Sequence, residues 1–520
     1  MAILVSVAGA AGTLPFDPGR VAEQAATARA GPPVDSGEFL IDTTPSGYSI
    51  TARGGPAGPP AIAFGDGVYL VCWKTTVGSD TLFAARVSAS GVLLDSEALV
   101  IGATSSTGWG CAVAYGGSVF LVAWEHSGYS IRAARVSLAG QVLDPGGFTL
   151  SRGGQSRQEP ALAFNGDAFL VGWRSSQNYV TTIRGCVVLP DGSIINPEDI
   201  ELVPRTSRLH DHMHPSIASC GSQFLLAWAS TMTGDTALWA KRFDSAGTPL
   251  DTAPIQLCVE GQAGNEPAAA SGAGSYLVVW RTCEPFNPNL AGKRVSPDGA
   301  VLDRELIVIS EAWLRQEQPS VSFVGPDYVV TWQDGRNGYP DIYAARVTPA
   351  GALLDPEGIP VCVADSSQEM PAIACAGDSG GLIAWQDRRI RQGGPFIRAV
   401  RIDSLGRPTG PEILVGGDPL PAGFEESRGA PRLSIRLGTI HRRQTGGMRL
   451  AIPHLLTEGE ARICIFGARG TLVCALSVQT GTNAVWRYQD RAGRPVPAGT
   501  YVLRARVDGH LFERKFILVE

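Results

Sequence analysis

Charged residues are scarce in this chain. Asp, Glu, Lys and Arg make up 18% of its 520 residues, against roughly 25% in an average soluble protein. Only four of the 43 basic residues are lysines, and the formal net charge is -6. This composition gives neither the basic face of a nucleic-acid binder nor a polybasic patch for an anionic membrane. We therefore expect no nucleic acid as a partner.

Long apolar runs and helix-compatible windows are also missing. No stretch of 18 apolar residues occurs, so we expect no transmembrane segment. No window of a dozen residues avoids Gly and Pro while keeping an apolar period of 3.6. The 63 glycines and 36 prolines therefore indicate a globular all-β chain with many short strands and turns.

The ten cysteines form no C-x-x-C pair, which excludes a zinc ribbon and a small disulfide scaffold. We expect most of them to be small buried apolar residues. Cys464 and Cys474 are ten residues apart across an apparent hairpin, and a disulfide between them stays an open alternative.

The first 36 residues are either an export signal or a disordered tail. They begin with a short apolar core followed by small residues, as a signal peptide does, but no Lys or Arg precedes that core. Both alternatives stay open for residues 1–36.

The strongest feature that is present is an internal repeat. A tryptophan closes an apolar run such as Tyr-Leu-Val-Cys-Trp or Phe-Leu-Val-Ala-Trp once every 49 to 55 residues. The repeated positions are Trp73, Trp124, Trp173, Trp228, Trp280, Trp332 and Trp385. Seven units of this period, each with four strand-like runs, are typical of a β-propeller. We predict a seven-bladed propeller over residues 37–420, with residues 38–41 as the outer strand that closes the last blade.

The sixth unit has the clearest repeat, Trp332-Gln-Asp-Gly-Arg-Asn-Gly-Tyr-Pro-Asp-Ile-Tyr-Ala-Ala-Arg-Val347. It resembles the propeller repeats of large secreted bacterial proteins, and it is loosely similar to the Asp-Ile-Tyr repeats of TolB-type propellers. The resemblance implies the fold and says little about activity, because propellers carry many unrelated functions.

An arginine late in the third strand and an aspartate early in the fourth recur together. On a hairpin they share a face, so we predict ion pairs within or between blades. The pairs are Arg86 and Asp95, Arg135 and Asp144, Arg242 and Asp251, Arg294 and Asp303, and Arg346 and Asp355. In the third unit Val187 and Asn196 replace them.

Loop lengths distinguish the two faces of the ring. The first-to-second and third-to-fourth turns are short and uniform, whereas the other connections differ in every unit, and variable loops on a rigid scaffold usually bind ligands. Polar residues precede the innermost strands on this variable face, and we expect them to form a candidate binding rim for a sugar, a peptide or a cation. The candidate rim residues are Trp109, Gln158, Glu159, His214, Asn265, Glu266, Glu317, Gln318 and Glu369. The alternative is a solvated rim without a ligand.

Two short motifs have a possible chemical meaning. His210, His212 and His214 alternate in an extended segment and are a candidate metal site, with an exposed polar loop as the alternative. Residues 377–381, Gly-Asp-Ser-Gly-Gly, match the nucleophile motif of serine proteases. They align with a tight turn of the other units and lack the required histidine and aspartate, so we interpret them as a turn.

The repeat stops after residue 420, and residues 421–430 are predicted to be a linker. Short alternating strands over residues 431–520 predict a small immunoglobulin-like β-sandwich. The segment Asp490-Arg-Ala-Gly-Arg-Pro-Val-Pro-Ala-Gly-Thr-Tyr-Val-Leu-Arg-Ala-Arg-Val507 resembles FlgD-like immunoglobulin domains and is similar to type IX secretion sorting domains. The resemblance implies export and attachment to the cell surface, and it implies no catalytic residue.

The sequence thus favours a secreted or surface-displayed binding protein that recognises a glycan or a protein through the variable face. The alternative is an extracellular carbohydrate-active hydrolase that uses Glu159, Glu266, Glu317 or Glu369 as its paired carboxylates. Aromatic side chains in the variable loops would stack on sugar rings or pack the loops onto the blades. These aromatic residues are Trp109, Tyr129, Tyr179, Phe286, Trp313 and Tyr339.

Overall fold

A computed structural model describes two parts of the chain. The first is residues 58–416, apart from residues 76–79, 105–109, 152–155, 178–179, 205–209, 233–234, 260–263, 283–287, 313, 365 and 390–395. The second consists of strands and turns between residues 439 and 519. Residues 1–57, with the expected export-like segment and the expected closing strand at 38–41, lie outside the described residues.

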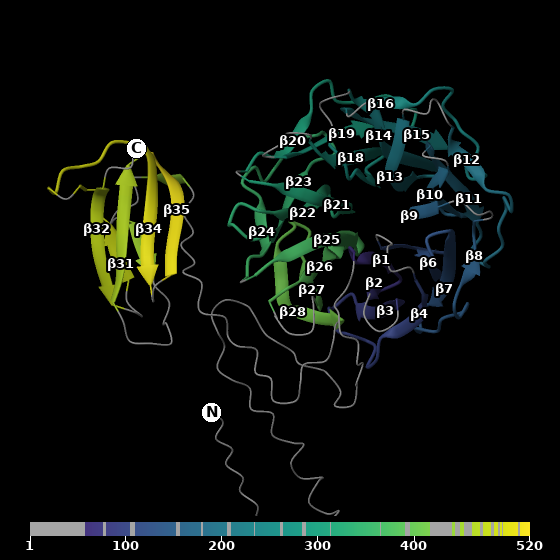
Figure 1. Ribbon diagram of the computed structural model, residues 1–520, viewed down its shortest axis with the longest axis horizontal. Helices are drawn as coiled ribbons and strands as arrows, with labels where there is room; N and C mark the ends of the chain where they lie inside the picture. Colours follow the sequence, from purple (N-terminus) through teal and green to yellow (C-terminus); the bar gives the residue numbers. More distant parts are fainter. Residues whose placement is uncertain are drawn as a thin grey trace, which may run out of the picture.

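Residues 58–416 form seven four-stranded antiparallel sheets arranged in a ring, which confirms the seven-bladed propeller (Figure 1). Blade 1 contains β1 (Ala61–Gly65), β2 (Val68–Thr75), β3 (Thr81–Ser88) and β4 (Leu99–Ala103), and blade 2 contains β5 (Cys111–Gly116), β6 (Val119–His126), β7 (Ser130–Ser137) and β8 (Phe148–Thr149). Blade 3 contains β9 (Ser156–Phe164), β10 (Phe169–Gln177), β11 (Val180–Val188) and β12 (Ile200–Val203), and blade 4 contains β13 (His210–Cys220), β14 (Gln223–Met232), β15 (Asp235–Phe243) and β16 (Ile255–Cys258).

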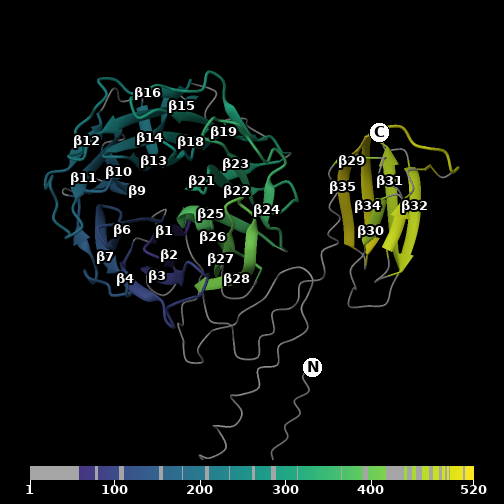
Figure 2. The ribbon, with the colours of Figure 1, turned by 180° about the vertical axis from the view of Figure 1, so that it is seen from behind.

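Blades 5 to 7 continue the same order. Blade 5 contains β17 (Ala268–Gly272), β18 (Ser275–Arg281), β19 (Leu290–Val295) and β20 (Ile307–Ser310). Blade 6 contains β21 (Gln316–Val324), β22 (Asp327–Asp334), β23 (Asp341–Val347) and β24 (Ile359–Cys362). Blade 7 contains β25 (Gln368–Cys375), the 3-10 turn η1 (Gly377–Ser379), β26 (Gly381–Asp387), β27 (Phe396–Ile402) and β28 (Pro408–Gly416). The first strand of each blade lies nearest the ring axis, and the fourth lies at the periphery (Figure 2).

The last blade closes differently from our expectation. Its sheet order is β25-β26-β27-β28, so its fourth strand comes from residues 408–416 of the same unit. The strand expected at residues 38–41 would occupy this same place. Each blade is therefore built from one continuous segment of the chain.

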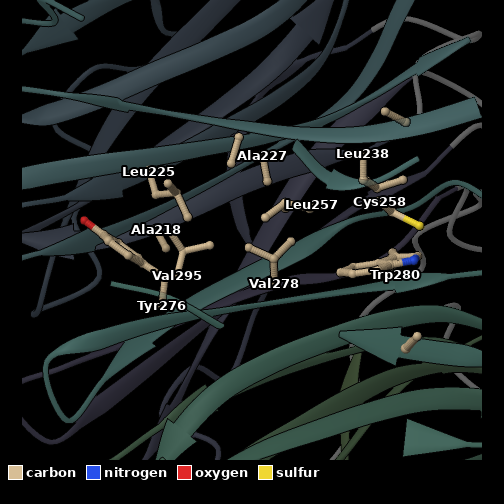
Figure 3. Packing of buried hydrophobic residues seen from close by; sticks show 13 residues of the cluster. Ala218, Leu225, Ala227, Leu238, Leu257, Cys258, Tyr276, Val278, Trp280 and Val295 are labelled. Atoms are coloured by element: carbon tan, nitrogen blue, oxygen red, sulfur yellow. The ribbon is translucent and has the colours of Figure 1, made fainter. Parts of the chain in front are cut away.

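The second strand of each blade is buried on both faces, which explains its continuous apolar run. In β14, Phe224, Leu226 and Trp228 pack toward blade 3, whereas Leu225 and Ala227 pack toward Val278 and Trp280 of blade 5 (Figure 3). The repeated tryptophan fills the interface with the preceding blade. The hydrophobic core is therefore a set of interfaces between blades.

The predicted arginine–aspartate pairs are confirmed, and they connect blades as well. The pairs have N–O distances between 2.5 Å, for Arg242 and Asp251, and 2.9 Å, for Arg346 and Asp355. Arg86 also donates to the Leu138 carbonyl of the next blade at 2.7 Å. In blade 3 the exception is confirmed, because the Val187 amide donates to Asn196 Oδ1 at 3.2 Å.

The described C-terminal strands are β29 (Thr439–His441), β30 (Met448–Ala451), β31 (Glu460–Gly467), β32 (Leu472–Gln479), β33 (Asn483–Trp486), β34 (Gly499–Val507) and β35 (His510–Val519). They form a five-stranded sheet of order β29-β35-β34-β31-β32 and a two-stranded sheet of β30 and β33. In the hairpin of β31 and β32, Cys474 pairs with Ile465 and Cys464 pairs with Ala475. The two cysteines are therefore not direct partners across the ladder.

Candidate functional site

The candidate rim begins with an unusual backbone conformation that recurs around the ring. Immediately before the inner strand resumes its pairing, six blades have one residue with positive φ. These residues are Gly110, Glu159, His214, Glu266, Gln318 and Met370. The five that are not glycine have φ between 52° and 64°, and each precedes a proline. L-residues adopt this conformation at a cost on the order of 1–3 kcal/mol each, and such residues cluster at functional sites.

At three of these positions, a β-bulge interrupts the pairing of the inner strand with the second strand. The ladder register shifts between Met213 and Ser216, between Glu317 and Ser320, and between Glu369 and Ala372. A bulge of this kind re-aims a side chain and interrupts pairing. We call the residues at these bulges, together with the side chains bonded to them, the rim.

Glu159 joins blades 3 and 4 at the rim. Its Oε2 accepts the backbone N–H of His214 at 2.6 Å, and its Oε1 accepts from Arg174 at 3.4 Å. Arg174 also contacts Asp211 at 3.1 Å, and the Thr181 hydroxyl donates to the same carboxylate at 2.6 Å. Hydrogen bonds from two residues on different blades therefore hold the Glu159 carboxylate in place.

Glu266 repeats the arrangement between blades 5 and 6. Its carboxylate accepts the Gln318 backbone N–H at 2.8 Å and the Gln318 side-chain amide at 3.3 Å. Arg281 lies 3.7 Å from Glu266 and 3.8 Å from Glu317, and Arg315 lies 3.6 Å from Glu317. Two carboxylates and two guanidinium groups therefore neutralise each other here.

The remaining described candidate residues differ in their contacts. Glu369 accepts from Arg388 Nε at 2.9 Å. The backbone carbonyl of Asn265 accepts the Arg281 backbone N–H at 3.1 Å, whereas the side-chain Oδ1 of Asn265 is buried without a hydrogen-bond partner among the described residues. Gln158 pairs with Arg174 across β9 and β10. Trp109 lies outside the described residues.

Sequence reasoning missed the residue that directly follows each repeated tryptophan. The positions are Lys74, Glu125, Arg174, Ala229, Arg281, Gln333 and Gln386. Because side chains alternate along the second strand, this residue points away from the tryptophan and toward the next blade. Gln333 Oε1 accepts the Met370 backbone N–H at 3.3 Å, and Gln386 donates to the Gly58 carbonyl. The sequence does mark this position, because its residue type differs between blades directly after a nearly constant apolar run.

Glu125 is the exception among these side chains. It is 0% exposed, and neither of its carboxylate oxygens has a hydrogen-bond partner among the described residues. Burial raises the pKa of Glu125 to about 7, the Lys74 ammonium opposes this shift, and the Glu159 carboxylate adds to it. Burial likewise lowers the pKa of Lys74, against the attraction of Asp80 and Glu125.

Two histidines of the predicted metal site, His212 and His214, have different surroundings. His212 is buried and lies edge-on to Trp228, with ring centroids 6.4 Å apart. His214 is at the bulge, with its Nδ1 3.6 Å from Glu159 Oε2. His210 begins β13, and its side chain lies outside the described residues. Among the residues that the structure describes, no cluster of three or more His, Cys, Asp or Glu side chains is placed to hold a metal ion.

The protease-like motif forms a turn, as we interpreted it. Gly377–Ser379 is a single 3-10 turn between β25 and β26, and the Ser379 hydroxyl donates to the Ala376 carbonyl at 2.7 Å. The hydroxyl is therefore occupied by the turn itself.

Two exposed tyrosines stand on the variable loops. Tyr129, between β6 and β7, is 62% exposed, and Tyr339, between β22 and β23, is 60% exposed. The other loop aromatics named above, Trp109, Tyr179, Phe286 and Trp313, lie outside the described residues.

No protein-family model and no curated protein matches the chain. Among solved structures, a puromycin hydrolase matches with 16% identity and a TM-score of 0.45, over 72% of this chain and 56% of that one. A polysaccharide lyase of the ulvan lyase type has 9% identity and a TM-score of 0.46, over 68% and 94%. The propeller domain of the Trilobed protease from Pyrococcus furiosus has 8% identity and a TM-score of 0.42, over 70% and 100%.

The chain thus spans just over half of the puromycin hydrolase. At these identities and scores, the likenesses carry no argument about activity or ligand. In the part of the chain that the structure describes, no helix has the length and apolarity needed to cross a bilayer.

Proposed function

We propose that the chain is a binding protein whose rim recognises an uncharged, hydroxyl-rich ligand, such as a neutral glycan on a polysaccharide or a glycoprotein. The observation that carries this proposal is the pairing of the rim charges. Glu159, Glu266, Glu317 and Glu369 each lie beside an arginine. A ring of neutralised but hydrogen-bonding groups suits hydroxyl groups better than a charged ligand.

The same contacts argue against the hydrolase alternative. A glycosidase needs one protonated carboxylic acid and one free carboxylate, both against the scissile bond. Glu159 and Glu266 instead accept backbone N–H groups of the next blade. Each is therefore part of the joint between two blades, which leaves it poorly placed to exchange a proton with a substrate.

Binding of the full chain to an array of neutral glycans tests the proposal. Arg388→Ala removes one exposed rim donor, which has Glu369 as its described partner. We expect about a tenfold loss of affinity for this variant, because a hydrogen bond from a charged donor contributes about 1.5 kcal/mol or more. Arg304→Ala is the matched control, since Arg304 is 96% exposed in the turn between β19 and β20 and outside the rim.

The hydrolase alternative has its own readout. If the chain binds no glycan but degrades a polysaccharide, and if Glu159→Gln or Glu266→Gln abolishes that turnover, the binding proposal is wrong. A glutamine retains an oxygen that accepts the interblade N–H, so these variants are expected to fold.

We also propose that the protein is extracellular or displayed on the cell surface, and that residues 431–520 are a sorting or anchoring β-sandwich. The support is the resemblance of residues 490–507 to FlgD-like domains, together with the β-sheets observed in this region. Fractionation of producing cells tests this proposal. A chain ending at residue 420 should leave the surface fraction, and its unchanged retention there would contradict the anchoring role.

A further inference from the structure

We call the interface between two neighbouring blades a seam. At one seam, two cysteines stand at repeat positions where the other blades have different residues. In the inner strand β5, Ala112 pairs with Ala123, the residue before the repeated Trp124. Cys111 directly precedes Ala112. The other six blades have a proline there, namely Pro60, Pro160, Pro215, Pro267, Pro319 and Pro371. Cys72 directly precedes Trp73, where the other blades have Ala123, Gly172, Ala227, Val279, Thr331 and Ala384. Each repeat position therefore holds a cysteine only once.

The two departures meet between blades 1 and 2. Cys72 belongs to the buried cluster that also contains Leu70 and Trp124, and Cys111 packs against this cluster. The backbone approaches closely at the same point, because a Cβ on Gly110 would lie 3.5 Å from Pro59 of blade 1. Burial, and next the contact with the Cys111 thiol, raise the pKa of Cys72 well above its ordinary value.

The two thiols differ in access. Cys72 is 0% exposed, whereas Cys111 is partly exposed on the inner strand β5, and both are free thiols in the structure. A dissolved disulfide therefore reaches Cys111 first. The resulting mixed disulfide places an electrophilic sulfur beside Cys72.

We propose that Cys72 and Cys111 form a redox-active dithiol that closes to a disulfide across the seam of blades 1 and 2. The Cys111 thiolate attacks a small-molecule disulfide such as oxidised glutathione, which releases one glutathione thiol. Cys72 attacks the Cys111 sulfur, and its proton passes to the departing glutathione sulfur, which leaves as the second glutathione thiol. Two protein thiols are oxidised and one glutathione disulfide is reduced to two thiols, so atoms and electrons balance.

The bond has a structural consequence. It closes a loop of about 40 residues and ties the first blade covalently to the second, which lowers the conformational entropy of the unfolded chain. Oxidation should therefore stabilise the propeller, and reduction should leave it folded, because the reduced thiols already pack in the seam.

Peptide mapping of the folded full chain tests the proposal. The chain is incubated with oxidised glutathione, alkylated and digested with trypsin without reduction. Cleavage after Arg53, Lys74, Arg86 and Arg132 separates residues 54–74 from residues 87–132, and each peptide contains one cysteine. We expect these two peptides to be linked, and we expect the melting temperature to rise by roughly 5 °C on oxidation.

Variants separate this disulfide from general thiol oxidation. Cys111→Pro restores the residue of the other six blades and should fold, yet it should lose both the linked peptides and the dependence of the melting temperature on oxidation. Cys220→Ser changes another partly exposed inner-strand cysteine and should keep both. A stable glutathione adduct on Cys111, or linked peptides that form only in denaturant, would overturn the proposal.

Discussion

At several interfaces between blades, the residue after the repeated tryptophan helps to join the two blades at the rim. Arg174 and Arg281 contact carboxylates, and Gln333 accepts an N–H from the next blade. Glu125 stands at the same position with both oxygens unpartnered among the described residues. A buried carboxylate without hydrogen bonds favours its protonated form, which is why its pKa rises.

This residue should make stability depend on pH. The pKa of Glu125 is about 7 in the folded protein against an ordinary value of 4.5, so the folded state binds its proton more tightly than the unfolded state does. The contribution to stability is complete below pH 4.5 and is lost as the pH rises through 7. The loss is about 3 kcal/mol by linkage.

Glu125→Gln removes the titration while retaining the shape of the side chain. We expect the variant to gain most of that free energy of unfolding at pH 8 and little at pH 4.5, as measured by urea unfolding at both pH values. Glu305→Gln is the control, because Glu305 is 89% exposed, and it should show no such difference. An unchanged pH dependence in Glu125→Gln would show that another group is responsible.

At the scale of elements, the turns between third and fourth strands join neighbouring blades. Arg242 binds Asp251 of its own blade and donates to the Pro297 carbonyl of the next blade. Gly299 closes that second turn with a φ of 93°, and a Cβ there would lie 2.9 Å from Arg242 Nε. The glycine is therefore required both by the left-handed backbone and by the approach of the arginine.

Gly299→Ala should destabilise the propeller more than an alanine at a comparable open turn. Gly274 has a φ of 76°, and a Cβ added there would have no other atom within 4 Å. We expect Gly274→Ala to cost about 1 kcal/mol from the backbone alone. Gly299→Ala should cost about 2–3 kcal/mol, because the displaced arginine also loses charge-assisted hydrogen bonds. Equal unfolding midpoints in guanidinium chloride would contradict this role of the arginine.

At the scale of the molecule, the ring is completed by β28 and by side chains at the seam of blades 7 and 1. Glu412 of β28 binds Arg389 and lies 3.5 Å from the buried Arg398. Arg401 reaches the Ser90 carbonyl of blade 1 at 3.5 Å. The closure within the described residues therefore depends on residues 408–416 and on side-chain contacts between complete blades.

Truncation tests this closure. A chain ending at Gly416 should keep cooperative thermal unfolding, since all seven described blades are complete. A chain ending at Arg407 loses β28 and, with it, the contact between Glu412 and the buried Arg398. We expect a fall of more than 10 °C in its melting temperature or failure to fold, because removing a partner of a buried charge costs roughly 3–5 kcal/mol. If the shorter chain is equally stable, another segment, such as residues 38–41, supplies the fourth strand.

The sequence by itself determined the seven blades, the strand order of the first six, the uniform turns and the arginine–aspartate pairs. Each of these features depends on contacts within one repeat, between residues that are close along the chain. The same pattern therefore occurs in several repeats, which makes it recognisable in the sequence. The protease-like motif was interpreted correctly for the same reason.

Only the tertiary structure decided what happens between repeats. The bonds from Glu159 to His214 and from Glu266 to Gln318 join residues 55 and 52 positions apart. The choice of β28 over residues 38–41 as the closing strand is likewise made at the level of the whole ring. The sequence predicted the rim glutamates but not their partners. The partners are brought together by the positive-φ bulge, and the residues that adopt this backbone conformation are of several different types, so no residue type marks it in the sequence. The local pattern thus specifies the blades, whereas the fit of one blade against the next decides the chemistry of the rim.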